Sequence, residues 1–187
     1  MDFILASGSI HRKELLLSAD FEPKEIVTAD IDETPYPDEK PVDYVCRMAK
    51  TKAEAVHALK PAEIILAADT IVVCNNRIIQ KSKNAEEQRA VMKLLSGSKH
   101  CVLTAVCLIH KDGTIHQEMS ETGVKFKTLS EKEIDLYVSS NRWVGCCGYN
   151  NDGIMESFTE GYEGSYSGLV GLPLCIVRKL FEEVGLL

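Results

Sequence analysis

The longest apolar segment of the chain runs from Ile64 to Cys74, and it constrains the fold more than any other feature. Its β-branched residues predict a strand over 64–73, and Asn75-Asn76 predicts a turn into a short strand over 77–79. The segment is much shorter than the roughly 20 apolar residues that a membrane-spanning helix needs. The chain is therefore expected to fold around a buried strand without contact with a membrane.

Helical and strand patterns alternate on both sides of this segment, which is typical of an α/β fold with a mixed sheet. The length of 187 residues suits one compact domain. The turn Lys111-Asp112-Gly113 predicts that the strands beside it form an antiparallel hairpin. The expected helices cover residues 10–18, 42–59, 85–95, 131–139 and a closing segment from Pro173, and the other expected strands cover 3–6, 100–109 and 114–126.

The stretch from Gly145 to Gly171 contains seven of the twelve glycines, which predicts a loop-rich region with a functional role. It includes the adjacent pair Cys146-Cys147, so a thiol-dependent enzyme is one alternative. The seven cysteines of the chain show no spacing typical of a zinc site, and a reduced, cytoplasmic location is expected. The polar run 86–89 is expected to be a solvated helix face.

The chain is acidic, with 21 Lys and Arg residues against 28 Asp and Glu residues and a formal charge of −7. This balance argues against binding to nucleic acids or anionic membranes, because a phosphate backbone requires a basic face. Cations that bind an anion must therefore be few and local. The N-terminus has neither the basic start nor the apolar core of a signal peptide, which also favours a cytoplasmic protein.

Two residues break the apolar patterns of their segments. Asp69 interrupts the longest apolar run, where an unpaired carboxylate would cost on the order of several kcal/mol. Lys52 has apolar neighbours three and four positions away on the expected helix, so it lies within the apolar stripe. Each residue has an ordinary alternative, because an aspartate can cap a turn at a strand end and a lysine can extend its head to water.

The turn Ser7-Gly8-Ser9 joins the first expected strand to the first expected helix, with Arg12 in the first helical turn. Small residues in such a turn leave backbone N–H groups at the positive end of the helix, which suits an anion. Ordinary capping of the helix by Ser9 is the alternative.

Together these segments resemble the Maf family of nucleoside triphosphate pyrophosphatases over essentially the whole chain. The matching motifs are LASGSIHRKELL over 5–16, DIDE over 30–33, AKTKA over 49–53, ADTIV over 68–72 with Lys81 after it, LSG over 95–97, GSY over 164–166 and VGLPL over 170–174.

The resemblance implies an elongated, twisted mixed sheet with helices on both sides and two lobes that flank a cleft, all within one domain of residues 1–187. It also implies a homodimer, a divalent cation (Mg²⁺ or Mn²⁺), and a hydrolase of acid anhydrides. Such an enzyme cleaves a nucleoside triphosphate between the α and β phosphates, which releases the monophosphate and pyrophosphate.

By the same resemblance, Asp69 and Glu33 are the catalytic carboxylates and the metal ligands. Whether Asp69 acts mainly as a general base or beside the metal stays open. The residues that would hold the triphosphate are Ser7, Ser9, Arg12, Lys52 and Lys81.

Three further positions bear on the choice of base in the family: His11, Thr70 and Asp152. The family's usual arginine is His11 here, its lysine is Gly145 and its glutamine is Asp152. Because Thr70 is retained, dTTP and UTP are the expected substrates. A pyrophosphatase for 7-methyl-GTP or another modified nucleotide is an alternative, and so is a non-catalytic nucleotide-binding module.

Overall fold

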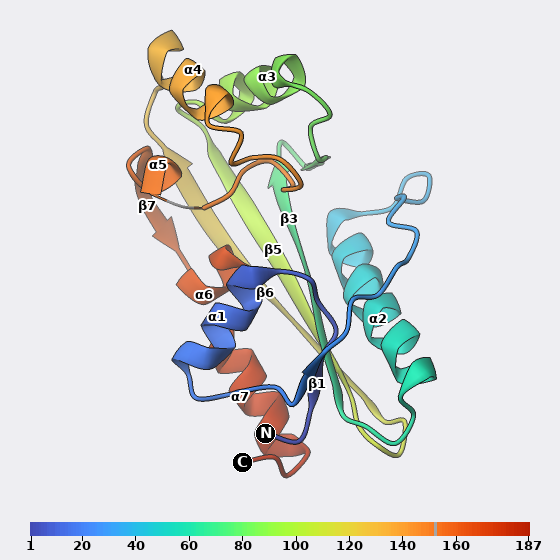
Figure 1. The fold of residues 1–187 in the computed structure, drawn as a ribbon. Helices are drawn as coiled ribbons and strands as arrows, with labels where there is room; N and C mark the ends of the chain where they lie inside the picture. Colours follow the sequence, from blue (N-terminus) through green and yellow to red (C-terminus); the bar gives the residue numbers. More distant parts are fainter. Residues whose placement is uncertain (152) are drawn as a thin grey trace.

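A computed structural model describes residues 1–151 and 153–187 (Figure 1). Within these residues, seven strands form one mixed sheet in the order β2-β1-β3-β5-β6-β7, and β4 pairs with β3. Strands β1, β2 and β3 are parallel neighbours, and the other pairings are antiparallel. The strands are β1 (Ile4–Leu5), β2 (Glu25–Ile26), β3 (Ile65–Cys74), β4 (Arg77–Ile79), β5 (Lys99–Ile109), β6 (Ile115–Phe126) and β7 (Thr159–Glu163).

Helices cover both faces of the sheet, which confirms the α/β fold expected from the sequence. Figure 1 shows α2 on one side of the long central strands, α1 and α7 on the other, and α3 and α4 together at one end of the sheet. The helices are α1 (Ile10–Ser18), α2 (Pro41–Leu59), α3 (Ala85–Leu95), α4 (Glu131–Ser139), α5 (Gly153–Glu156), α6 (Tyr166–Val170) and α7 (Leu174–Glu183). Among the described residues, no helix combines the length and apolar character needed to cross a bilayer.

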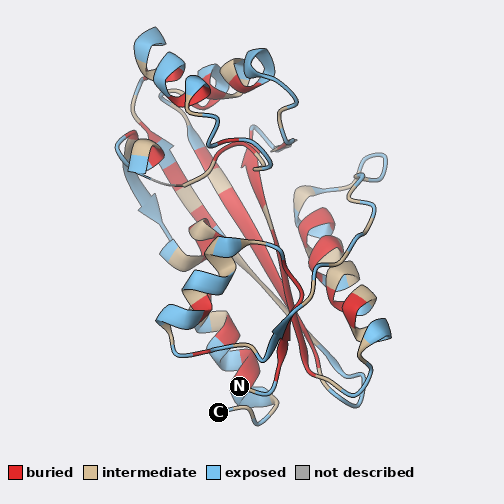
Figure 2. Ribbon diagram, in the orientation of Figure 1, coloured by how far each residue is buried: buried red, intermediate tan, exposed pale blue. Residues whose placement is uncertain are grey.

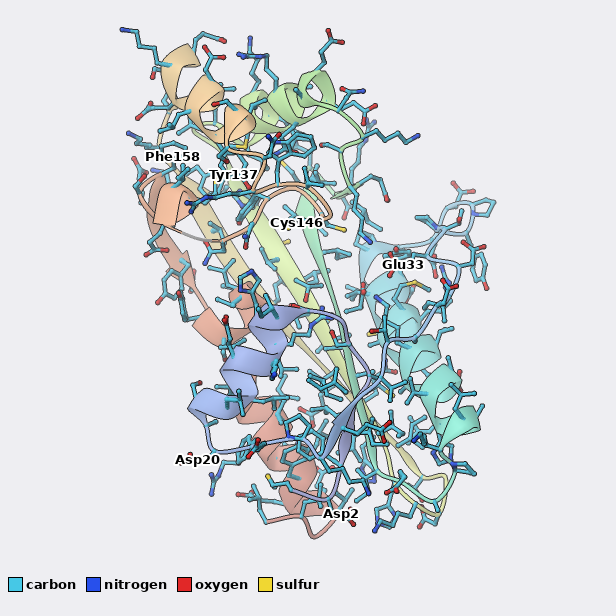
Figure 3. The ribbon with its side chains drawn as sticks, viewed as in Figure 1. Asp2, Asp20, Glu33, Tyr137, Cys146 and Phe158 are labelled. Atoms are coloured by element: carbon cyan, nitrogen blue, oxygen red, sulfur yellow. The ribbon has the colours of Figure 1, made fainter. Side chains whose placement is uncertain are left out.

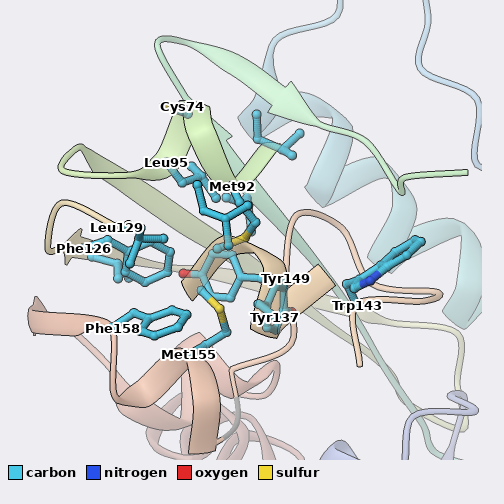
Figure 4. Packing of buried hydrophobic residues seen from close by; sticks show 14 of the residues in the cluster. Cys74, Met92, Leu95, Phe126, Leu129, Tyr137, Trp143, Tyr149, Met155 and Phe158 are labelled. Atoms are coloured by element: carbon cyan, nitrogen blue, oxygen red, sulfur yellow. The ribbon is translucent and has the colours of Figure 1, made fainter. Parts of the chain in front are cut away.

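The central strands are buried on both faces, as Figure 2 shows for β3 and β5. Alternate residues of β3 belong to different clusters of buried hydrophobic side chains. Ile71 belongs to the cluster under α2, and Leu66 belongs to the cluster under α1 and α7. A third cluster joins α3 and α4 to the sheet and contains Met92, Phe126 and Tyr149 (Figure 4). The period-two alternation of β3 thus supplies all three cores.

Local signals in the sequence place most helix starts correctly. Asn84 caps α3 by accepting a hydrogen bond from the backbone N–H of Glu87, and Ser130 with Glu133 forms a capping box at α4. Asn75 and Asn76 have φ values of 51° and 60°, as a tight hairpin turn between β3 and β4 requires. These predictions are confirmed.

The stretch from Gly145 to Gly171 contains more regular structure than its composition predicts. Strand β7 and the short helices α5 and α6 lie within it. Every residue of β7 except the half-buried Thr159 is exposed, so the strand has no apolar alternation to reveal it. Pro173 is the N-cap of α7 rather than a residue of its first turn.

Strand β3 has an interrupted edge on the side away from β5. Strand β1 pairs with Ile65 and Leu66 of β3, and β4 pairs with Val72 to Cys74. Within the described chain, residues 67–71 have no strand partner on this side, whereas β5 pairs with all of them on the other. The gap leaves the backbone edge without a strand partner at Asp69 and Thr70, the two polar residues of the strand.

Candidate active site

A cavity of ≈ 240 Å³ lies at the interrupted edge of β3. Its walls come from the start of α1, the acidic loop before α2, α2 itself, β3, α6 and the loop after α4. A smaller cavity of ≈ 160 Å³ shares four of its residues and continues along the Ser7-Gly8-Ser9 turn. The polar residues that line the larger cavity are Ser9, His11, Arg12, Glu33, Tyr44, Lys52, Asp69, Thr70, Lys81, Cys146, Cys147, Tyr149, Asn150 and Asn151.

Lys52 joins the two carboxylates of the site. Its Nζ lies 2.5 Å from Oδ1 of Asp69 and 2.8 Å from Oε1 of Glu33, and Nζ of Lys81 lies 2.6 Å from Oε2 of Glu33. Burial opposes the charge of Glu33, but hydrogen bonds from both lysines outweigh it and lower the pKa of Glu33 to about 2. The apolar stripe of α2 therefore directs Lys52 to a carboxylate pair and not to solvent.

Arg12 is a cation held by neutral acceptors. Its Nε donates to the carbonyl of Gly171 at 2.9 Å, Nη1 donates to Oγ of Ser7 at 3.0 Å, and Nη2 donates to Oγ1 of Thr70 at 3.1 Å. No carboxylate of the described residues forms an ion pair with it. Burial lowers the pKa of Arg12. These bonds use three of the five guanidinium N–H groups, so two remain for an anion.

Thr70 connects this arginine to the rest of the fold. Its Oγ1 lies 3.0 Å from Oγ1 of Thr104 on β5, and Thr104 donates to the carbonyl of Gly168 in α6 at 2.8 Å. Arg12 lies in the first turn of α1, and Ser9 caps this helix by accepting a hydrogen bond from the backbone N–H of Arg12. Thr70 and Thr104 therefore fix the position of the guanidinium.

The loop after α4 is held over the cavity at four points. Residues 81 and 147 form an isolated antiparallel bridge, and the buried side chain of Gln88 donates to the carbonyl of Gly148 at 2.8 Å. Gly148 has φ of 75°, and a Cβ there would lie 3.0 Å from the side chain of Val72. The hydroxyl of Tyr149 lies 2.8 Å from Nε2 of His100. Gln88 is completely buried, so the prediction of a solvated face for 86–89 is wrong at this residue.

The burial of His100 makes the stability of the protein depend on pH. Burial lowers the pKa of His100 from 6.5 to about 4. The unfolded chain therefore takes up a proton near pH 6.5 while the folded protein resists protonation until about pH 4, so stability falls as the pH falls through this window. As the pH falls from 6.5 to about 4, we expect His100 to account for a loss of about 3 kcal/mol in the free energy of unfolding. Urea unfolding of the protein and of His100→Gln between these pH values should show a steeper slope for the protein, and equal slopes would contradict the assignment.

Cys147 does not have the protonation state of a nucleophile. Burial, and after it the negative charge of Asp69, raises the pKa of Cys147 to about 11, so its thiol is protonated at neutral pH. Sγ of Cys146 lies 3.9 Å from the carbonyl of Arg142. Figure 3 shows Cys146 on the loop after α4 and Glu33 beside the start of α2. The protonated thiol of Cys147 therefore does not support the thiol-dependent alternative at this residue.

The carboxylates suit a divalent cation that is shared with a substrate. Among the described residues, no group of three or more His, Cys, Asp or Glu side chains could hold a metal ion alone. Glu33 and Asp69 contact the same ammonium, so their oxygens lie within reach of one cation. Mg²⁺ commonly binds one or two carboxylates together with substrate phosphates and water. The donor set fits such an ion better than a closed protein cage.

The residues singled out from the sequence mostly meet at one place. Ser7 is buried under Arg12, and Asp152 lies outside the described residues. The cavity wall includes the other eight: Ser9, His11, Arg12, Glu33, Lys52, Asp69, Thr70 and Lys81. Their roles in binding and catalysis remain predictions.

Sequence reasoning misses several residues that shape the site. The hydroxyl of Tyr44 donates to the carbonyl of Glu33 at 2.8 Å and holds the acidic loop. Thr104 and Gln88 act through buried hydrogen bonds to glycine carbonyls. No local sequence pattern predicts the glycine partners of Thr104 and Gln88, because each glycine is at least 60 positions away in the sequence.

This chain is similar to several known proteins. The family described as Maf-like protein matches residues 2–184. A dTTP/UTP pyrophosphatase from Novosphingobium aromaticivorans is 40% identical over 186 residues, which cover 99% of this chain and 92% of the relative. A dTTP/UTP pyrophosphatase from Agrobacterium fabrum is 43% identical over 189 residues, with 97% and 91% covered. Among solved structures, a nucleoside-triphosphatase / dITP/XTP pyrophosphatase from Mycobacterium abscessus has a TM-score of 0.44 and 13% identity, covering 67% of this chain and 73% of that chain.

Proposed function

Since this chain belongs to the Maf-like family, we propose that it hydrolyses nucleoside triphosphates to the monophosphate and pyrophosphate, with dTTP and UTP as preferred substrates. One observation carries the proposal: Arg12, Lys52 and Lys81 converge with two carboxylates at the interrupted edge of β3. A protein with a formal charge of −7 thus concentrates cations where a polyanion can be held.

The cations supply the binding of the triphosphate. Arg12 has two N–H groups left for phosphate oxygens, and its other three bonds keep the guanidinium in a fixed orientation. Lys52 and Lys81 exchange their carboxylate partners for phosphate oxygens when the substrate enters. The turn before α1 adds backbone N–H groups along the smaller cavity.

The carboxylates supply the hydrolysis. Glu33 and Asp69 would hold a divalent cation together with the phosphates, and this ion would stabilise the charge that develops on them. Asp69 orients a water molecule toward the α phosphorus, and it or the solvent receives the proton. The water oxygen bonds to phosphorus as the bond to the bridging oxygen breaks, and pyrophosphate leaves with the bonding electrons.

Release of pyrophosphate from a panel of nucleotides tests the proposal. With Mg²⁺, we expect dTTP and UTP to have the highest kcat/KM, and excess EDTA should abolish turnover until Mg²⁺ or Mn²⁺ is restored. The panel includes 7-methyl-GTP, because a preference for it would support the alternative specificity. Calorimetric binding of triphosphates without product over hours would instead support a non-catalytic nucleotide-binding module.

A further inference from the structure

A side-chain amide without partners lies in the wall of the cavity. Both polar atoms of Asn151, Oδ1 and Nδ2, are buried and have no hydrogen-bond partner in the part of the chain that the structure describes. The other such atoms there are single ring nitrogens of His57 and His100, which a neutral imidazole can leave unprotonated. Burying an amide with both groups unpaired is unfavourable, so its place in a cavity wall points to a ligand.

The cavity has a charged part and an apolar part, and Asn151 belongs to the loop that covers the apolar part. Val72 follows Asp69 by three residues along β3, which is about 10 Å at roughly 3.3 Å per residue. Val102 is the register partner of Val72 on β5, and both line the cavity with Leu169. This part is lined by apolar side chains and lies apart from the ion pair of Lys52 with Asp69, so it suits the base of a nucleotide whose phosphates lie at the charged part.

The loop that contains Asn151 is fixed against this apolar surface. Gly148 lies against Val72, and Tyr149 is held by His100 and buried beside Phe126. The backbone N–H of Asn150 donates to the hydroxyl of Tyr137 at 2.9 Å. Asn151 is thus carried by a backbone anchored on its N-terminal side, as a residue that reads a ligand requires.

We infer that Asn151 recognises the imide edge of uracil or thymine, with Oδ1 accepting the N3–H and Nδ2 donating to a neighbouring carbonyl oxygen of the base. An amide presents an acceptor and a donor side by side, and an imide presents a donor and an acceptor at the same spacing. The inference rests on the proposed function and assigns the residue that selects its substrates.

The pairing is tested by changing the base of the substrate and the side chain of Asn151, separately and together. The protein should hydrolyse UTP with a kcat/KM about 10- to 100-fold higher than that for 3-methyl-UTP, because the methyl group removes the N3–H donor. Asn151→Leu should lose a similar factor on UTP and change less than about threefold on 3-methyl-UTP. Asn151→Asp, which keeps the shape but lacks the donor, should also lose activity on UTP.

Two further readouts separate base recognition from other roles. The melting temperature of Asn151→Leu should equal or exceed that of the unchanged protein, because the leucine removes unpaired buried groups. Inhibition by pyrophosphate, which has no base, should be the same in both proteins within about twofold. A lower melting temperature would indicate a structural role, and weaker inhibition would place the amide at the phosphates; either result overturns the inference.

The outcomes also distinguish this inference from the proposed function. A protein that hydrolyses UTP but discriminates equally against 3-methyl-UTP with and without Asn151 retains the function and loses the inference. Equal hydrolysis of UTP and 3-methyl-UTP by the unchanged protein would likewise retain the function and overturn the inference. A protein that hydrolyses none of the nucleotides overturns the function and the inference with it.

Discussion

Replacing Asp69 with Asn should reduce kcat for pyrophosphate release by about 10³-fold or more while the protein stays folded. In the proposed mechanism this carboxylate orients the water and contributes to the metal site, and loss of either role commonly lowers the rate by several orders of magnitude. Folding should be retained because Lys52 keeps its contact with Glu33 at 2.8 Å. Single-turnover release of pyrophosphate from UTP measures the loss, and the melting temperature reports on the fold.

A matched substitution controls for the loss of one negative charge. Asp43 lies exposed in the first turn of α2, and Asp43→Asn should retain turnover within about twofold. If Asp69→Asn also retained wild-type turnover, Asp69 would have no part in the chemistry. Because Asp69 contacts Lys52 and Asp43 does not, the two variants separate a local role from a change in net charge.

Arg12→Lys should lower kcat/KM by about 10²- to 10³-fold, although it preserves the charge. A lysine cannot donate to Gly171, Ser7 and Thr70 together and still present two N–H groups to a phosphate. The acceptors left without a donor should also reduce the free energy of unfolding by about 1–3 kcal/mol. Initial rates on UTP and urea unfolding measure the two effects.

The neighbouring lysine provides the control for Arg12. Lys13 is exposed on α1, so Lys13→Ala should change kcat/KM by less than about twofold. Full activity in Arg12→Lys would show that the site needs only a positive charge at this position. It would also remove the fixed guanidinium from the account of phosphate binding.

The helical spacing of apolar residues predicts part of the site, as Lys52 shows. Its neighbours on α2 are buried, so the stripe that contains it faces β3 and meets Asp69. Glu33 and Lys81 lie outside regular elements, where no period indicates direction, and only the family resemblance selected them. Capping residues such as Asn84 predicted helix boundaries because their hydrogen bonds are local.

Long-range hydrogen bonds are the part that the sequence cannot reveal. Gln88 reads as polar and exposed, yet its amide reaches Gly148, 60 positions away. Tyr149 and His100 are 49 positions apart and meet only because the loop after α4 folds back over β3 and β5. Strand β7 is missed for a related reason, since its pairing with β6 and not its own composition makes it a strand.

The interrupted edge of β3 has a consequence for self-association. Unpaired strand edges are templates for pairing with other chains, and a charged side chain on such an edge opposes that pairing. Asp69 supplies this charge in the middle of the open stretch 67–71, with Lys52 bound to it. If the proposed function holds, the position that interrupts the β3 edge with a charged residue is also the position that serves hydrolysis.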